Sequence, residues 1–148
     1  MSSLSDFLNP LPLNEVREVI ISKRFVQRDE KGNPVMKDGE PVLRPFKIRT
    51  VSQEENESIA KQATHTVKVN GKVVKEMDDL EYSRRLVVAA TLEPDFSSKE
   101  TCDSVGVLDP LMVPGRMLSS GEYAKLANAI MKLSGFDGED PLGAEIKN

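Results

Sequence analysis

The 148-residue sequence contains no tryptophan, one histidine and one cysteine, and only 5% of its residues are aromatic. Because Cys102 is the single cysteine, an internal disulfide is excluded and the fold does not depend on an oxidising compartment. One histidine and one cysteine are also too few for the four nitrogen or sulfur ligands of a usual structural zinc site. The fold must therefore be stabilised by an apolar core with few large aromatic side chains.

Long apolar runs are missing as well. The densest one, residues 86–92, is far too short to cross a bilayer, and the N-terminal MSSLSDFLNP lacks the basic segment and apolar stretch of a secretory signal. Twenty lysines and arginines against twenty-four aspartates and glutamates give a net charge of −4, which is too weak to indicate nucleic acid or an anionic membrane as partner. We therefore expect a cytoplasmic protein.

No group of residues has the spacing typical of catalysis or cofactor binding. The glycines near 32, 39 and 135 are not followed by the helix and Lys-Ser/Thr of a phosphate-binding loop, and the acidic residues do not match a calcium loop. A nucleophilic pair of Cys102 and His65 has no local feature that would activate the thiol. The basic pairs at 23–24 and 84–85 lack interleaved aromatic residues and indicate solvent-facing positions. We predict no catalytic residue, no metal and no cofactor.

The chain does have the length and patterning of one α+β domain. β-Branched residues over 16–26 and alternation over 46–49 predict two antiparallel strands. Turn signals at 32–34 and 38–41 predict that a long hairpin tip or a small extra ribbon connects them. Asn70-Gly71 predicts a type I′ hairpin with Val67 opposite Val74, and we expect another element to cover this ribbon because an isolated one is marginally stable.

Helix signals are concentrated in the second half of the chain. Capping boxes at Ser52/Glu55 and Ser119/Glu122 predict helices near 52–64 and 119–134, and two further helices are expected near 79–92 and 98–105. The small antiparallel sheet is expected from 16–28 and 42–51, with 66–75 as a further candidate strand. We expect an N-terminal arm (1–15) with one helical turn near 5–8, a single α+β domain (16–136) and a flexible C-terminal tail (137–148).

A flexible apolar segment, PLMVPGRMLSSGEY, precedes the last predicted helix. Two interpretations remain open: its side chains pack beneath that helix as core, or they flank a groove that accepts a peptide, since methionine adapts to irregular partners. This segment favours a binding module over an enzyme.

Four segments together resemble the XkdN-like tail assembly chaperones of contractile-tailed phages and defective prophages. They are residues 19–26 with PFKIRTVSQEE, then LEYSRRLVVAATLEPDF, DSVGVLDPLMV and MLSSGEYAKLANAIMKLSGF. The resemblance covers most of residues 13–137 and depends on the order and spacing of the segments. One departure is that Ser119-Ser120 stand where the family pattern has a proline before Gly-Glu-Tyr.

The resemblance implies a non-enzymatic role during phage assembly in the host cytoplasm. Such proteins coat the long, helical, aggregation-prone tape measure protein, assist polymerisation of the tail tube protein around it, and are absent from the finished tail. Many are also made in a longer, frameshifted form. A structural tail or baseplate adaptor retained in the virion is the alternative, and a small cytoplasmic enzyme is a third, disfavoured class.

The resemblance also implies where a client or a second copy would bind. We expect this site on the last helix, the segment before it and the apolar stretch of 80–92, and we expect that replacing Met112 and Met117 with serine weakens capture of the tape measure. The predicted partner-binding residues are Leu111, Met112, Met117, Leu118, Tyr123, Leu126 and Ile130.

Overall fold

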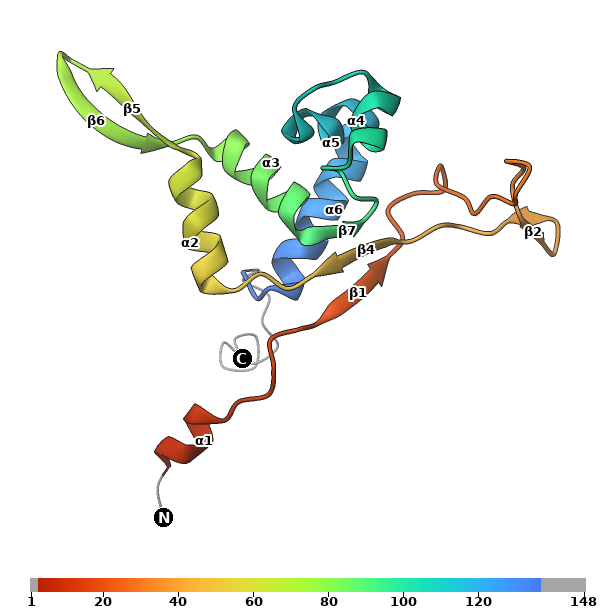
Figure 1. Ribbon diagram of the computed structural model, residues 1–148, viewed down its shortest axis with the longest axis horizontal. Helices are drawn as coiled ribbons and strands as arrows, with labels where there is room; N and C mark the ends of the chain where they lie inside the picture. The colour runs from red at the N-terminus through yellow and green to blue at the C-terminus, as the bar shows by residue number, and fades with distance from the viewer. Residues whose placement is uncertain (1–2, 137–148) are drawn as a thin grey trace, which may run out of the picture.

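The computed structural model describes residues 3–136 as a helical body built on one face of a small antiparallel sheet (Figure 1). The sheet has three strands in the order β1-β4-β7, namely Val16–Val19, Phe46–Arg49 and Thr91–Glu93. Helices α3 (Asp79–Ala90) and α6 (Ser120–Leu133) contact its strands, and two separate two-stranded ribbons extend outward. The α+β class predicted from the sequence is confirmed.

Strand β4 occupies the centre of the sheet. It pairs antiparallel with β1, as the sequence predicted, and the structure sets Val16 opposite Arg49 and Val19 opposite Phe46. Phe46 and Ile48 are buried, whereas Lys47 and Arg49 are half-buried, so the alternating pattern directs the apolar side chains toward the helices.

The third strand of the sheet differs from the prediction. Residues 91–92 were assigned to the end of a helix, and 66–75 were offered as a sheet strand, but α3 ends at Ala90 and β7 follows directly. The buried Thr91 side chain donates to the carbonyl of Val87 at 2.7 Å, which satisfies a helix-end acceptor while its backbone becomes extended. Strand β7 pairs with β4, with Thr91 opposite Ile48.

The two ribbons follow their turn signals. Strands β2 (Met36–Lys37) and β3 (Glu40–Pro41) form the small extra ribbon that the sequence predicted between the first two sheet strands. Strands β5 (Thr64–Val69) and β6 (Lys72–Met77) form the Asn-Gly hairpin, with Val67 opposite Val74 and positive φ at Asn70 and Gly71. The hairpin projects from the body, and every residue of β6 is exposed (Figure 1). Among residues 3–136, no element covers β6 in the way that we expected for this ribbon.

Most of the predicted helices are present. The Ser52 side chain caps α2 by accepting a hydrogen bond from the backbone N–H of Glu55, as the predicted capping box requires. The Glu55 side chain, however, does not bond back to the backbone of Ser52. Its carboxylate accepts two hydrogen bonds from Arg49 instead, at 2.8 and 2.6 Å. The flexible apolar segment before α6 contains short helices that the sequence did not predict. The Asp109 side chain caps the first of them by accepting from the backbone N–H of Leu111, and a proline lies in the first turn of each. The remaining elements are α1 (Leu4–Leu8), α2 (Gln53–Gln62), α4 (Lys99–Val105), η1 (Pro110–Met112) and α5 (Val113–Met117).

Three phenylalanines meet in the core at the junction of sheet and helices. Phe46 lies between Phe25, with ring centroids 5.0 Å apart, and Phe96, at 6.5 Å. Aliphatic residues from the helices complete the core. The largest fully buried side chains are Phe96, Ile48, Leu86, Leu126, Ile130, Val87, Val113 and Pro114.

A buried carboxylate fixes the start of α6 to the segment that follows β1. Glu122 is only 7% exposed, and it completes the predicted capping box by accepting from the backbone N–H of Ser119 at 2.8 Å. The guanidinium of Arg24 donates to both carboxylate oxygens, at 2.8 and 2.6 Å, and to the carbonyl of Met117 at 3.0 Å. The hydrogen bond from Arg24 is the main cause that holds the pKa of Glu122 far below its ordinary value of 4.5.

Because the pKa of Glu122 is lowered in the folded state, its contribution to stability is present above its ordinary pKa and is lost as the pH falls below it. We expect Glu122→Gln to lower the thermal unfolding midpoint at neutral pH, and this difference from the parent protein to shrink as the pH is lowered from about 5 to about 3. Differential scanning calorimetry across this pH range measures the unfolding midpoint of the variant and of the parent protein. The exposed Glu57→Gln serves as control and should follow the parent protein. A difference that stays constant with pH would contradict the role of Glu122.

Candidate protein-binding surface

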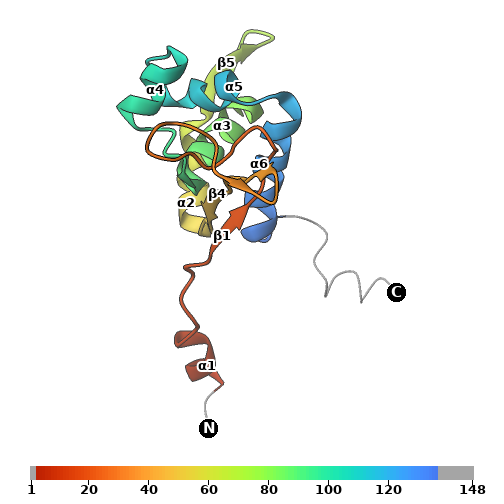
Figure 2. The same ribbon diagram turned by 90° about the vertical axis from the view of Figure 1, so that its right-hand side faces the viewer.

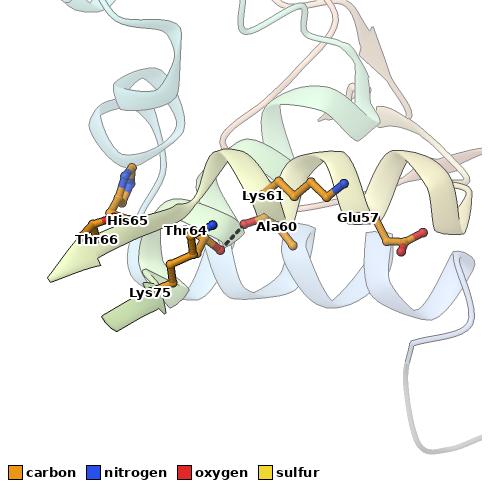
Figure 3. Close-up of a pocket in the computed structure, with 7 residues that line it drawn as sticks. All are labelled: Glu57, Ala60, Lys61, Thr64, His65, Thr66 and Lys75. Carbon is orange, nitrogen blue, oxygen red and sulfur yellow. Dashed lines mark hydrogen bonds between the residues drawn. The ribbon is translucent and has the colours of Figure 1, made fainter. Parts of the chain in front are cut away.

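A polar hollow of about 570 Å³ lies between the end of α2 and the base of the hairpin (Figure 3). Its side chains do not converge: Glu57 and Lys61 lie along α2, and His65 points away from Thr64 and Lys75. The Thr64 hydroxyl donates to the carbonyl of Ala60 at 2.7 Å, which satisfies an acceptor near the helix end. Among these residues no nucleophile is paired with a base. The hydrogen bond of Thr64 stabilises the junction between α2 and β5.

His65 and Cys102 lie in different surroundings. The His65 ring is exposed and its Nε2 lies 2.7 Å from Glu81 Oε1, while Arg85 donates to the other oxygen at 2.8 Å. Both contacts lower the pKa of Glu81, with that of His65 the larger. Cys102 is buried, with its sulfur 3.8 Å from the carbonyl of Phe96. Neither residue has the other as a partner, so the structure does not assemble a Cys-His nucleophile.

A metal site and a membrane-spanning helix are also absent from the described residues. No cluster of three or more histidine, cysteine, aspartate or glutamate side chains in residues 3–136 has the geometry to hold a metal ion. Within the same residues, every helix is too short or too polar to cross a bilayer.

Exposed apolar side chains distinguish this surface instead. One group lies on the N-terminal arm, a second on the β5–β6 hairpin, and a third at the corner between α4 and α5. Exposed apolar groups of this kind on a folded body indicate surfaces that contact other proteins. The members are Leu4, Phe7, Leu8, Leu11 and Leu13; Val69, Val73, Val74 and Met77; and Leu108 with Met112.

The third group, Leu108 and Met112, and the half-buried Leu111 between them form what we call the 108–112 corner. The side chain of Leu108 is 99% exposed and that of Met112 is 43% exposed. Leu111 lines a hollow of about 280 Å³ with Val88 and Ala89 of α3, next to α2. The short turn η1 holds these residues because its Asp109 cap and Pro110 fix the backbone beside α3. The corner therefore presents flexible apolar side chains on a backbone that packs against α3.

The comparisons with known proteins identify the family. Residues 4–147 match the phage XkdN-like tail assembly chaperone protein family. The chain belongs to this family. It is 34% identical to the phage-like element PBSX protein XkdN of Bacillus subtilis (strain 168) over 88% of this chain and 83% of that protein. It is 36% identical to the uncharacterized protein YqbN of the same strain over 81% of this chain and 74% of that protein. The crystal structure of YqbN superposes with a TM-score of 0.67 at 30% identity, covering 88% of this chain and 95% of the other.

In this member of the XkdN-like family, the structure divides the seven residues predicted to bind a partner. Leu118, Leu126 and Ile130 are buried and belong to the core. Tyr123 is half-buried, and its hydroxyl lies 2.8 Å from the Ser83 hydroxyl, which joins α6 to α3.

The other three predicted residues reach the surface at two places. Leu111 and Met112 lie in the 108–112 corner, whereas Met117 lines a separate apolar hollow of about 370 Å³ with Phe25 and Phe46. Leu118 therefore packs as core, as the first interpretation expects. For Leu111, Met112 and Met117 the peptide-groove interpretation stays a prediction. Leu108 was missed because a single leucine within a turn creates no periodic pattern.

The core position of Leu126 has a measurable consequence for this XkdN-like protein. Truncation by Leu126→Ala removes fully buried methyl groups and leaves a cavity, so we expect the free energy of unfolding to fall by about 2–5 kcal/mol. Urea denaturation followed by circular dichroism measures the change. Leu108→Ala, at the exposed corner, should change stability by less than about 0.5 kcal/mol. Equal stability of the two variants would place Leu126 outside the core.

Proposed function

We propose that this protein binds the tape measure protein non-catalytically in the host cytoplasm, keeps it covered until tail tube subunits polymerise around it, and leaves before the tail is complete. Membership of the tail assembly chaperone family supports this role. The exposed apolar groups also support it, because a long amphipathic client requires many weak apolar contacts. The polar hollow beside His65 offers no competing catalytic arrangement.

The observation that carries the proposal is the 108–112 corner. Leu108 and Met112 are exposed although the fold buries Val113 immediately afterwards, so the chain keeps apolar side chains at the surface on a well-packed support. The hollow with Val88 and Ala89 lies beside them and is bordered by Glu55 and Arg85. An apolar centre with a charged border fits one face of an amphipathic helix, and flexible methionine accommodates sequence variation along that helix.

The first test uses the double variant Leu108→Ser with Met112→Ser. Fully burying one such side chain contributes about 1.5–3 kcal/mol, so we expect capture of a purified tape measure segment to weaken at least about tenfold. Isothermal titration calorimetry or co-purification measures the affinity for this segment. Met117→Ser is left out of this pair because Met117 is half-buried beside Phe25 and Phe46, so lost packing would be mixed with lost binding.

Met36→Ser provides the matched control, since Met36 is an exposed methionine on the separate β2–β3 ribbon. It should bind as the parent protein does. If the double variant keeps the parent circular dichroism and the parent affinity, the 108–112 corner is not the client site.

The second test concerns the finished particle. A chaperone that leaves during assembly should be absent from purified phage or prophage particles in which the tube protein is abundant. Quantitative mass spectrometry of those particles, together with the lysate from which they were purified, measures both proteins. Recovery of this protein in a fixed ratio to other tail components would contradict the proposal and would instead indicate a tail or baseplate adaptor.

A further inference from the structure

The outer side of β1 leaves backbone hydrogen-bonding groups unused within residues 3–136. The backbone N–H of Thr50 donates to the carbonyl of Glu15, one step before the pair Val16–Arg49. Because bonded and non-bonded pairs alternate in an antiparallel ladder, Val16 and Glu18 direct their N–H and C=O groups away from β4. No strand in the described part of the chain pairs with this side of β1, which we call the β1 edge. An unpaired strand edge is a ready site for another extended segment.

Basic side chains lie along the β1 edge on the helical side of the sheet. Arg17 is opposite the buried Ile48, so it lies on the same side of the sheet as the helices. Helix α6 contacts β1, and the two elements lie close together in both views (Figures 1 and 2). The exposed Lys125 and Lys132 are two turns apart on one face of α6. We call Arg17, Lys125 and Lys132 the basic strip.

The basic strip has an excess of positive charge. None of its three side chains forms an ion pair with another residue of 3–136. Glu15 lies on the same side of the strand as Arg17, whereas Glu18 lies on the opposite side. The buried Glu122 of α6 is already paired with Arg24. Three basic groups against Glu15 leave a net charge of +2, so this surface fits an acidic segment.

The C-terminal residues 137–148 carry the matching charge. They contain four acidic side chains and one basic side chain, a net charge of −3, although the whole chain carries only −4. The acidic side chains are Asp137, Glu139, Asp140 and Glu145, and the basic one is Lys147. Opposite charges on two surfaces favour their association and fix its orientation.

The described chain ends beside the start of β1. The Ser134 hydroxyl accepts from the backbone N–H of Val51 at 3.0 Å, and the neighbouring Thr50 is bonded to Glu15. The twelve residues from 137 to 148 reach about 40 Å when extended, whereas the 14 residues of α6 span about 21 Å. These residues are therefore long enough to reverse direction after Phe136 and to follow both β1 and α6.

We propose that residues 137–148 dock along the β1 edge of their own chain as an extended segment, with their carboxylates against the basic strip. The backbone of this segment pairs with the free groups of Val16 and Glu18. The segment closes the edge to strands of other chains, which is one way in which folded proteins prevent edge-to-edge pairing. The inference is independent of the proposed client binding, because it uses neither the 108–112 corner nor a second molecule.

Hydrogen exchange of the full chain, followed by NMR at single amides, tests this contact. The amides of Arg17 and Val19 are bonded to β4 and should exchange slowly in every variant, so they serve as internal controls. We expect the amides of Val16 and Glu18, which we call the edge amides, to be protected in the parent protein. Their protection should stay the same on tenfold dilution, because the segment belongs to the same chain.

Charge variants test which groups hold the segment. The strip variant carries Lys125→Glu and Lys132→Glu, and the segment variant carries Glu139→Lys and Asp140→Lys. Each should speed exchange of the edge amides at least about fivefold, since several attractive contacts between exposed charges become repulsive. Combining all four substitutions restores opposite charges and should restore the protection.

The matched control is Lys68→Glu with Lys75→Glu on the projecting hairpin, which makes the same change in net charge far from β1 and should exchange like the parent protein. The proposal is overturned if the edge amides exchange freely in the parent protein, or if neither charge variant changes their protection. It is equally overturned if the protection falls on dilution, which indicates that a second copy covers the edge. Failure of the fourfold variant to recover the protection, with the parent circular dichroism, also contradicts it.

Discussion

The contact between Arg24 and Glu122 joins positions that are 98 residues apart and fixes how the helical half of the chain meets the sheet. The same carboxylate caps α6 and receives the guanidinium, so the start of the helix and the segment after β1 are positioned by one group. With α6 held in place, Leu126 and Ile130 belong to the same core cluster as Ile48 and Phe46 of the central strand. In a chain with few aromatic residues, this polar contact adds to a modest apolar core and fixes the geometry of the junction.

The core uses only part of the apolar residues that the sequence contains. Arm, hairpin and the 108–112 corner each keep large apolar side chains outside it, although the body between them is well packed. A protein whose fold required those side chains would bury them. Their exposure on three separate elements is understandable if contact with other protein chains covers them, which agrees with membership of an assembly chaperone family.

Local chemistry made most of the fold predictable from the sequence. Ser52, Ser119 and Asn70-Gly71 determine where helices begin or a hairpin turns, and the structure places those features where they were expected. Strand β7 was not predictable, because three residues between a helix and a proline are too few to show alternation. The roles of Leu126 and Ile130 were not predictable for another reason: an apolar helix face has the same periodicity whether it meets the core or a partner. Only the packing of α6 against the sheet decides between the two.

The separation of the exposed groups has a consequence for how the protein holds a client. The corner lies at the link between α4 and α5, whereas the arm extends below the body and the hairpin above it (Figures 1 and 2). A long client that contacts one of these groups therefore leaves the other two exposed groups of the same molecule free for further segments of the client. Multiple linked sites raise the overall affinity without strengthening any single contact, and they can release stepwise as tube subunits replace them.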